Sequence, residues 1–294
     1  VTYQLDGASV TYSAYTSGYS SATTRKLIIT VPASAPQLYY WCSIHSGMGG
    51  AINTNTTLGS SNFDGSIQST VKANTTAGFS IVKWTGNATS GATVGHGLGV
   101  APKWLIVKER GNTNDWVVYH KDLGTSSGNT NVQFLNLSND IGGGFAAGFN
   151  NTDPSSSVFT LGNSTETNRS SGNFITYCFN EVEGYSKFGK YTGNGSTNGT
   201  FVITNFRPSL IILKRFNSAA SWVIHDDKRS GSNPDNDYLH PDNAQSESDG
   251  SSGTLDILSN GFKLRMTAGT HNGSGDSYIY MAFARSPFKN SRAR

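Results

Sequence analysis

The chain has 294 residues, of which 34 are glycine, 11% are aromatic and only 14% are charged. So many aromatic residues exclude an intrinsically disordered chain, and abundant glycine with little charge is typical of turn-rich β proteins. The formal net charge of +3 is too small to indicate a nucleic-acid partner.

Eight segments alternate apolar and polar residues and are rich in β-branched and aromatic side chains, which predicts β-strands. In chain order they are residues 26–31, 79–84, 104–108, 116–119, 201–204, 210–214, 222–224 and 278–283. Stretches of glycine and small polar residues between them, such as 142–144 and 272–275, supply the positive φ angles that tight turns need. No segment of helical period competes with this pattern, so we predict an all-β protein.

The later part of the sequence contains the same pattern twice. Lys83-Trp-Thr-Gly-Asn87 matches Lys190-Tyr-Thr-Gly-Asn194, 107 positions later. Three further matches, each 106 positions apart, are Pro102 with Pro208, Lys108 with Lys214, and Trp116 with Trp222. Antiparallel units of about a hundred residues are most often sandwiches or jelly rolls. We therefore predict tandem antiparallel β-sandwich (jelly-roll-like) repeats at 77–184 and 185–294, preceded by a β segment at 1–52 and a linker at 53–76.

The most specific short motif lies in the N-terminal segment, in Tyr39-Tyr-Trp-Cys-Ser-Ile-His-Ser-Gly-Met48. Its C-x2-H-x2-M spacing resembles the copper loop of cupredoxins, in which a thiolate and an imidazole join a second imidazole and a weak axial thioether. The resemblance implies a partial cupredoxin-like segment with Cys42, His45 and Met48 as copper ligands. Residues 1–41 contain no histidine for the second imidazole, so the alternative is that Cys42 and His45 only pack.

A second candidate metal site is the acidic stretch 226–237. It carries four aspartates, Asp226, Asp227, Asp235 and Asp237. Carboxylate oxygens are the ligands that Ca²⁺ prefers, and it takes six to eight of them. The stretch lacks a fixed twelve-residue calcium loop, and Lys228 and Arg229 dilute its charge, so a solvated loop is the alternative interpretation.

Three residues are candidates for ligand binding. Trp84 and Tyr191 stand beside the two Thr-Gly-Asn turns, where we expect them to be exposed and able to stack on sugar rings. His96 lies in a Gly-His-Gly loop. Trp116 and Trp222, by contrast, occupy equivalent positions in the repeats, which favours a place in the core.

No catalytic residue is predicted. His120 and His225 follow the tryptophan strands at nearly equivalent places and stand near aspartates, but no G-x-S-x-G elbow accompanies them. Glu181 and Glu183 are two residues apart, which is too little to assign the acid and nucleophile of a glycosidase. No apolar run approaches the roughly 20 residues that span a bilayer.

Several longer runs resemble a domain family in virion proteins of marine tailed bacteriophages, described as tail or tail-fibre associated. The runs are 78–87, 94–103, 115–120, 177–189 and 258–264, and the resemblance extends from about residue 60 to the end. It implies a location in the virion, other virion proteins as partners, a homo-oligomer and contact with host cell-surface glycan. We predict a non-enzymatic structural protein of a tail fibre or similar appendage. The alternatives are a polysaccharide-cleaving tail enzyme and a copper-binding module.

Overall fold

The computed structural model describes residues 1–31, 38–42, 48–52, 59–126, 129–140, 146–250 and 253–286. The chain divides into two compact units, residues 1–60 and residues 61–294. Antiparallel sheets dominate both, which confirms the predicted all-β fold of sandwich type. Among the described residues, no helix has the length and apolar character required to cross a membrane.

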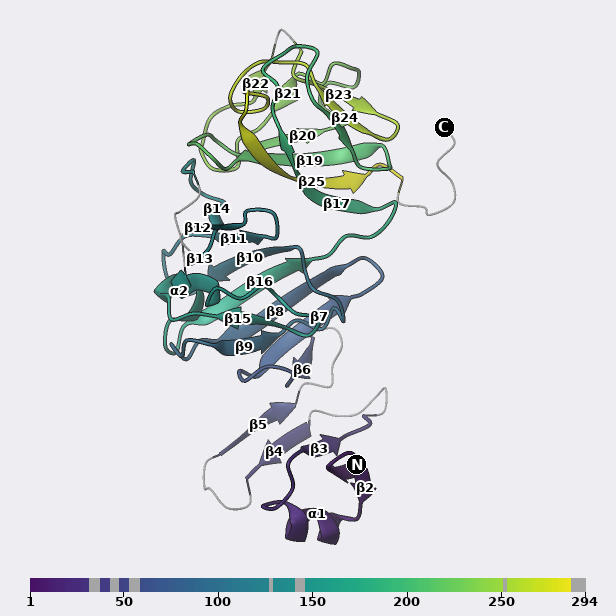
Figure 1. Ribbon diagram of the computed structural model, residues 1–294, viewed down its shortest axis with the longest axis vertical. Coiled ribbons are helices and arrows are strands. Elements are labelled where there is room, and N and C mark those ends of the chain that lie inside the picture. The colour runs from purple at the N-terminus through teal and green to yellow at the C-terminus, as the bar shows by residue number, and fades with distance from the viewer. Residues whose placement is uncertain are drawn as a thin grey trace. The chain divides into compact units, whose positions relative to one another are not determined.

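The N-terminal unit contains a three-stranded sheet and a separate hairpin (Figure 1). The sheet has the order β2-β1-β3, formed by β2 (Ala8–Val10), β1 (Thr2–Leu5) and β3 (Arg25–Ile28). A short helix that the sequence did not predict, α1 (Tyr12–Gly18), begins where the Thr11 hydroxyl accepts a hydrogen bond from Ala14 N. The hairpin pairs β4 (Leu38–Trp41) with β5 (Gly49–Ile52). Among the described residues of this unit, only Ala22 and Gly59 are buried.

Repeat 1 is a sandwich of a seven-stranded sheet and a two-stranded sheet. The larger sheet consists, in spatial order, of β14 (Gln133–Phe134), β11 (Val117–His120), β10 (Trp104–Glu109), β16 (Asn173–Phe179), β8 (Phe79–Thr85), β7 (Ser69–Asn74) and β6 (Ser60–Asn62). The smaller sheet pairs β9 (Ala92–Gly95) with β15 (Val158–Leu161). Alternate residues of β8, including Val82 and Trp84, point into the core that also holds Phe159 and Phe174.

Three minor elements complete repeat 1. They are the hairpin of β12 (Thr125–Ser126) and β13 (Asn129–Thr130), and the short helices α2 (Ala146–Phe149) and α3 (Thr165–Asn168).

The predicted linker at 53–76 is wrong over its second half. β7 pairs with β8 along its length, with Val71 opposite Val82, and β6 extends the same sheet. Ile67 forms a parallel bridge to Val94 and so covers the outer edge of β9. The polar composition of this stretch concealed these strands because only one of their faces is buried. Residues 53–58 lie outside the described residues.

Repeat 2 has the same arrangement with fewer strands. One sheet has the order β17 (Ser186–Thr192), β25 (Ser277–Ala284), β19 (Pro208–Arg215) and β20 (Val223–Asp226). The opposing sheet has the order β18 (Phe201–Ile203), β24 (Gly261–Leu264) and β23 (Leu255–Leu258), and a small hairpin joins β21 (Asp237–Tyr238) to β22 (Ser248–Asp249). Leu213, Phe262 and Tyr278 fill the space between the sheets.

The two repeats share a third hydrophobic cluster, which we call the inter-repeat core. Trp104, Phe188, Trp222 and Met281 are its largest buried members. In Figure 1 the sheet of β17, β25 and β19 accordingly lies over the sheet of β10 and β16. The ring centroids of Trp104 and Trp222 are 6.0 Å apart, and Trp222 Nε1 donates to the Phe134 carbonyl oxygen at 2.8 Å.

The prediction that Trp116 and Trp222 have the same core role is therefore wrong. Trp222 is completely buried between the repeats, whereas Trp116 is only partly buried. Lys214 is buried near Trp222, and its Nζ donates to the Ser138 carbonyl oxygen of repeat 1 at 3.0 Å. Burial lowers the pKa of Lys214 to about 8.

A buried asparagine in each repeat explains why the Thr-Gly-Asn turn recurs. Asn272 Oδ1 accepts from Asn194 N at 3.0 Å, and its Nδ2 contacts Asn194 Oδ1 at 2.9 Å. The same Nδ2 contacts the carbonyl oxygens of Ser196 at 2.8 Å and Met266 at 3.0 Å. The equivalent bonds of repeat 1 join Asn168 to Asn87, Thr89 and Gly162. A Cβ at Gly193 would lie 2.3 Å from the carbonyl oxygen of residue 273, so this close approach requires glycine.

A salt bridge occurs at equivalent places in both repeats with its charges reversed. In repeat 1, Glu109 at the end of β10 is completely buried, and its Oε1 accepts a hydrogen bond from Arg169 Nε at 2.7 Å. In repeat 2, Arg215 at the end of β19 pairs with Asp276 Oδ2 at 2.9 Å. Position 172, which is equivalent to Asp276, is a glycine, and so is position 273, which is equivalent to Arg169.

Candidate functional site

A chain of polar side chains crosses the core of repeat 2. Asp235 Oδ2 lies 2.9 Å from His225 Nδ1, and His225 Nε2 lies 3.0 Å from His271 Nε2. Thr270 Oγ1 lies 2.8 Å from His271 Nδ1. His225 is on β20, while Asp235 is held by reciprocal backbone hydrogen bonds to Leu255 at the start of β23. The loop between β24 and β25 supplies Thr270 and His271.

The chemistry of the groups fixes the direction of each hydrogen bond. The Asp235 carboxylate only accepts, so His225 carries its proton on Nδ1 and accepts at Nε2. His271 therefore donates from Nε2 and accepts the Thr270 hydroxyl proton at Nδ1. Burial lowers the pKa of His225, against the opposing effect of Asp235, and burial with repulsion from His225 lowers the pKa of His271 well below its usual range.

This network is enclosed by protein. His225 and His271 are 0% exposed and Asp235 is 2% exposed. The Tyr238 ring covers both imidazoles, with centroid distances of 5.5 Å to His225 and 4.9 Å to His271. Tyr191 Oη donates to the His271 carbonyl oxygen at 2.6 Å. In this conformation the network ties two loops to β20, which is a structural role.

His120 and His225 are not equivalent. In repeat 2, Ile211 pairs with His225 on the neighbouring strand. The equivalent of Ile211 in repeat 1 is Leu105, which pairs with Tyr119, so Tyr119 is the equivalent of His225. Tyr119 donates to Asp153 Oδ1 at 2.9 Å. His120 instead lies against Trp104 in the region between the repeats, and burial lowers its pKa to about 3. The sequence comparison placed His120 one residue out of register, which in a strand is the opposite face.

The four aspartates predicted to bind calcium do not converge. Asp226 accepts Arg229 Nε at 2.6 Å, and Asp227 accepts Ser209 Oγ at 2.9 Å. Asp235 is hydrogen-bonded to His225, and Asp237 accepts a hydrogen bond from Ser230 Oγ at 2.9 Å. Within the part of the chain that the structure describes, no group of three or more histidine, cysteine or acidic residues has the geometry to hold a metal ion. Each carboxylate is instead bound by a protein side chain, from the loop itself for Asp226 and Asp237 and from a strand for Asp227 and Asp235.

The expectation that Trp84 and Tyr191 are exposed is wrong. Trp84 is 3% exposed and stacks on Phe174 in the core of repeat 1, and Tyr191 is 8% exposed and stacks on Tyr278 in repeat 2. His96 is 0% exposed, with Nε2 3.2 Å from the Ser155 carbonyl oxygen. None of these three side chains therefore offers a face to a sugar.

The predicted copper loop is only partly described. Cys42 N donates to the Met48 carbonyl oxygen at 2.7 Å, so the two residues lie opposite each other at the end of the β4–β5 hairpin. Met48 is 57% exposed. His45 lies outside the described residues, and copper binding stays a prediction.

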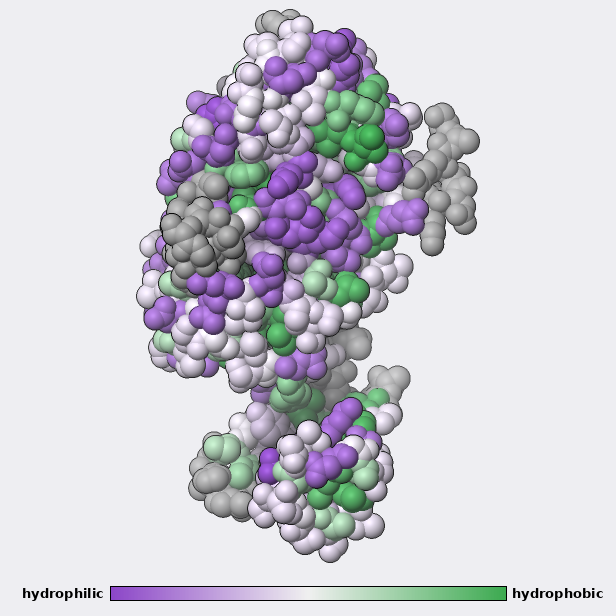
Figure 2. Space-filling model, viewed as in Figure 1, coloured by the Kyte–Doolittle hydropathy of each residue, from purple (hydrophilic) through white to green (hydrophobic). Residues whose placement is uncertain are grey.

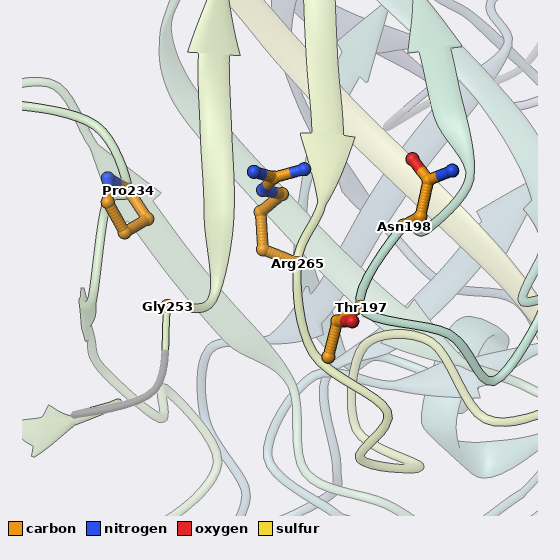
Figure 3. A pocket seen from close by; sticks show the side chains of 5 residues that line it. All are labelled: Thr197, Asn198, Pro234, Gly253 and Arg265. Atoms are coloured by element: carbon orange, nitrogen blue, oxygen red, sulfur yellow. The ribbon is translucent and has the colours of Figure 1, made fainter.

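A surface concavity of about 380 Å³ lies at one end of the β18-β24-β23 sheet, lined by Thr197, Asn198, Pro234, Gly253 and Arg265. Figure 3 shows the Arg265 guanidinium between Pro234 on one side and Asn198 on the other. Arg265 Nε lies 3.2 Å from Asp256 Oδ2. Its two Nη atoms donate no hydrogen bond to a described residue. Asn198 Oδ1 accepts Lys263 Nζ at 2.6 Å. The concavity thus offers a guanidinium, a hydroxyl, an amide and a proline ring to a ligand.

The fold and these sites define a tandem β-sandwich module in which each repeat has its own core and the inter-repeat core joins the two. A protein-family model matches residues 52–287, and the chain belongs to that family, which is described as a domain of unknown function, DUF7483. The match spans both repeats, so the family domain is the pair rather than the single repeat. Comparisons with curated proteins and with solved structures gave no match.

Sequence reasoning missed both the Arg265 concavity and His271. His271 is 46 positions from His225, and no spacing rule links them. The sequence does contain a signal for the paired asparagines. Asn168 and Asn272 are 104 positions apart, the same offset that relates β16 to β25, so a comparison of the loops before these two strands at that offset identifies the pair.

Proposed function

We propose that this chain is a non-enzymatic structural protein of a tailed bacteriophage particle, in a tail fibre or similar appendage, that also contacts host-surface glycan. The observation that best supports a structural role is the inter-repeat core. Trp104, Trp222 and Phe188 are each at most 1% exposed there, so the two sandwiches form one mechanically continuous body. The virion location itself rests on the sequence resemblance.

The use of polar groups also favours a structural role. Three ionisable side chains of repeat 2, His225, His271 and Asp235, belong to a buried hydrogen-bond network. Lys214 and its equivalent Lys108 both bind carbonyl oxygens of the loop that precedes the next strand. These bonds hold loops in place.

The Arg265 concavity is the best candidate for glycan contact. A guanidinium with two open Nη atoms suits bidentate binding of a carboxylate, and the proline ring suits the apolar face of a sugar. The ligand class is therefore a saccharide that carries a carboxylate. Isolated contacts of this kind are weak, and many copies on one appendage would multiply them.

Electron microscopy of phage particles labelled with an antibody against this chain tests the location. Label on an appendage supports the proposal, and unlabelled particles from a strain that encodes the chain contradict it. Release of new reducing ends from host polysaccharide by the purified protein would instead favour a polysaccharide-cleaving enzyme.

The glycan contact is tested by binding of the full chain to uronate-containing oligosaccharides. Arg265→Gln should weaken binding about 10- to 100-fold, as expected for loss of a charge-assisted bidentate contact. Arg110→Gln removes the same charge from an exposed site in repeat 1 and serves as the control. Equal binding by the wild type and Arg265→Gln would rule out the concavity as the contact.

A further inference from the structure

The two repeats differ in how the outer edge of the smaller sheet is covered. In repeat 1 that edge belongs to β9, and the chain before β7 runs along it. Ile67 N donates to the Thr93 carbonyl oxygen at 3.0 Å, and Ser66 N donates to Thr93 Oγ1 at 2.9 Å. Ser69 Oγ donates to the Gly95 carbonyl oxygen at 3.0 Å. Thr93 and Gly95 on this edge are thus hydrogen-bonded to the segment that covers it.

The equivalent edge of repeat 2 belongs to β18 and has no such cover. Leu264 N donates to the Thr200 carbonyl oxygen and Thr204 N to that of Asn260, so residues 200, 202 and 204 carry the ladder to β24. The backbone groups of Phe201 and Ile203 consequently face away from β24. No described residue binds them.

The side chains of this edge are apolar and exposed. Phe201 is 40% exposed and Ile203 is 56% exposed, while Val202 between them is buried in the core. On the face shown in Figure 2, hydrophobic surface gathers beside β24, the strand that pairs with β18. Exposed apolar edges are normally blocked, because they pair with other strands.

Another edge of repeat 2, that of β17, shows what such blocking looks like. Among the described residues no strand pairs with the outer side of β17, but Phe188 N donates there to Glu181 Oε1 at 3.0 Å, and the strand carries Lys187 and Lys190. Charged side chains on an edge strand oppose pairing with a second strand. Thr200-Phe-Val-Ile-Thr204 has no charge, so β18 is the edge that can accept another strand.

We propose that β18 is a self-association surface, at which a second copy of this chain pairs through its own β18. An antiparallel pair centred on Val202 sets Phe201 of one copy opposite Ile203 of the other, twice. The outward backbone groups of these residues then form reciprocal hydrogen bonds, and each aromatic ring meets a β-branched side chain, which is a favourable cross-strand pair. The surface is complementary to itself, as a two-fold interface requires.

The contact is small and its strength should match its size. A three-residue strand buries far less than the roughly 1,600 Å² of a standard stable interface, so association at this edge is weak and concentration-dependent. In an assembly that already holds copies side by side, a weak contact is sufficient. This inference holds whether or not the chain belongs to a virion.

Sedimentation velocity of the full chain, from low micromolar to about millimolar concentration, tests the proposal. The wild type should show a growing dimer fraction, and Ile203→Lys should remain monomeric with an unchanged melting temperature. Val100→Lys, at an exposed apolar residue of repeat 1, should dimerise like the wild type. A wild type that is monomeric throughout, or a dimer that persists in Ile203→Lys, overturns the proposal.

Cross-linking tests the register. In a Cys42→Ser background, a mixture of Phe201→Cys and Ile203→Cys chains should be linked by a short thiol cross-linker more efficiently than either variant alone, because residues 201 and 203 face each other across the two-fold axis. Equal yields contradict the antiparallel pairing. A monomeric wild type that binds a peptide of residues 64–74, with binding lost in Ile203→Lys, would show that the edge accepts a different strand and that the second-copy assignment is wrong.

Discussion

Replacement of Asn272 by alanine probes the internal tie of repeat 2 directly. The Asn272 side chain makes four contacts at 2.8–3.0 Å, to Asn194 N, Asn194 Oδ1 and the carbonyl oxygens of Ser196 and Met266. Asn272 is 0% exposed, so its partners are left without a replacement when the amide is removed. Nδ2 has only two hydrogens for its three acceptors, so the side chain makes three full hydrogen bonds at most. At a net value of about 1 kcal/mol for each hydrogen bond, the loss is about 3 kcal/mol of unfolding free energy.

Urea denaturation of the full chain measures this loss. With a denaturant slope of about 3 kcal/mol/M, the unfolding midpoint of repeat 2 should fall by about 1 M. Asn168→Ala should have a similar effect, because it removes the equivalent bonds of repeat 1. Asn243→Ala, at an exposed asparagine, should stay within about 0.5 kcal/mol of the wild type. An Asn272→Ala midpoint equal to that of Asn243→Ala would refute the argument.

Three further predictions concern stability. Trp222→Ala should lower the unfolding free energy by about 3–5 kcal/mol because it opens the inter-repeat core, whereas Trp116→Ala should cost clearly less, and equal losses would contradict this. Acidification below pH 6.5 should destabilise the fold, because the buried histidines with lowered pKa values bind protons more readily when unfolded; these are His96, His120, His225 and His271. The loss should reach at most about 1.4 kcal/mol per pH unit for each histidine and continue to about pH 3 for His120, and a urea midpoint that rises on acidification would contradict it. Chelation with EDTA should leave the melting temperature unchanged, because the four aspartates of 226–237 are bound by protein groups, and a clear decrease would revive the calcium hypothesis.

The strands and their duplication were predictable because they depend on local alternation. The predicted strands at 79–84, 210–214 and 278–283 coincide with β8, β19 and β25. β7 was missed because its exposed face is polar. Local pattern also misplaced Trp84. Trp84 is two residues after the buried Val82 on β8, so the two side chains lie on the same side of the sheet. This alternation, and not the adjacent turn, determines that Trp84 is buried.

The tertiary sites were less accessible to sequence reasoning. The Arg265 concavity joins loops that are far apart in the chain, at residues 197–198, 234, 253 and 265. The burial of Trp222 depends on repeat 1, since its indole binds Phe134. A pattern within one repeat contains no information about such a contact.

The reversed salt bridges have a consequence for how a duplicated sequence folds. Two similar repeats in one chain risk exchanging strands, so that β19 enters repeat 1 and β10 enters repeat 2. Such an exchange would set Arg215 against Arg169 and Glu109 against Asp276, so that each charge would face its own sign. Glu109, which is completely buried in repeat 1, would lose its arginine partner, and the like charges would repel each other, which the correct pairing avoids. The polarity of one ion pair thus labels each strand with the repeat in which it belongs.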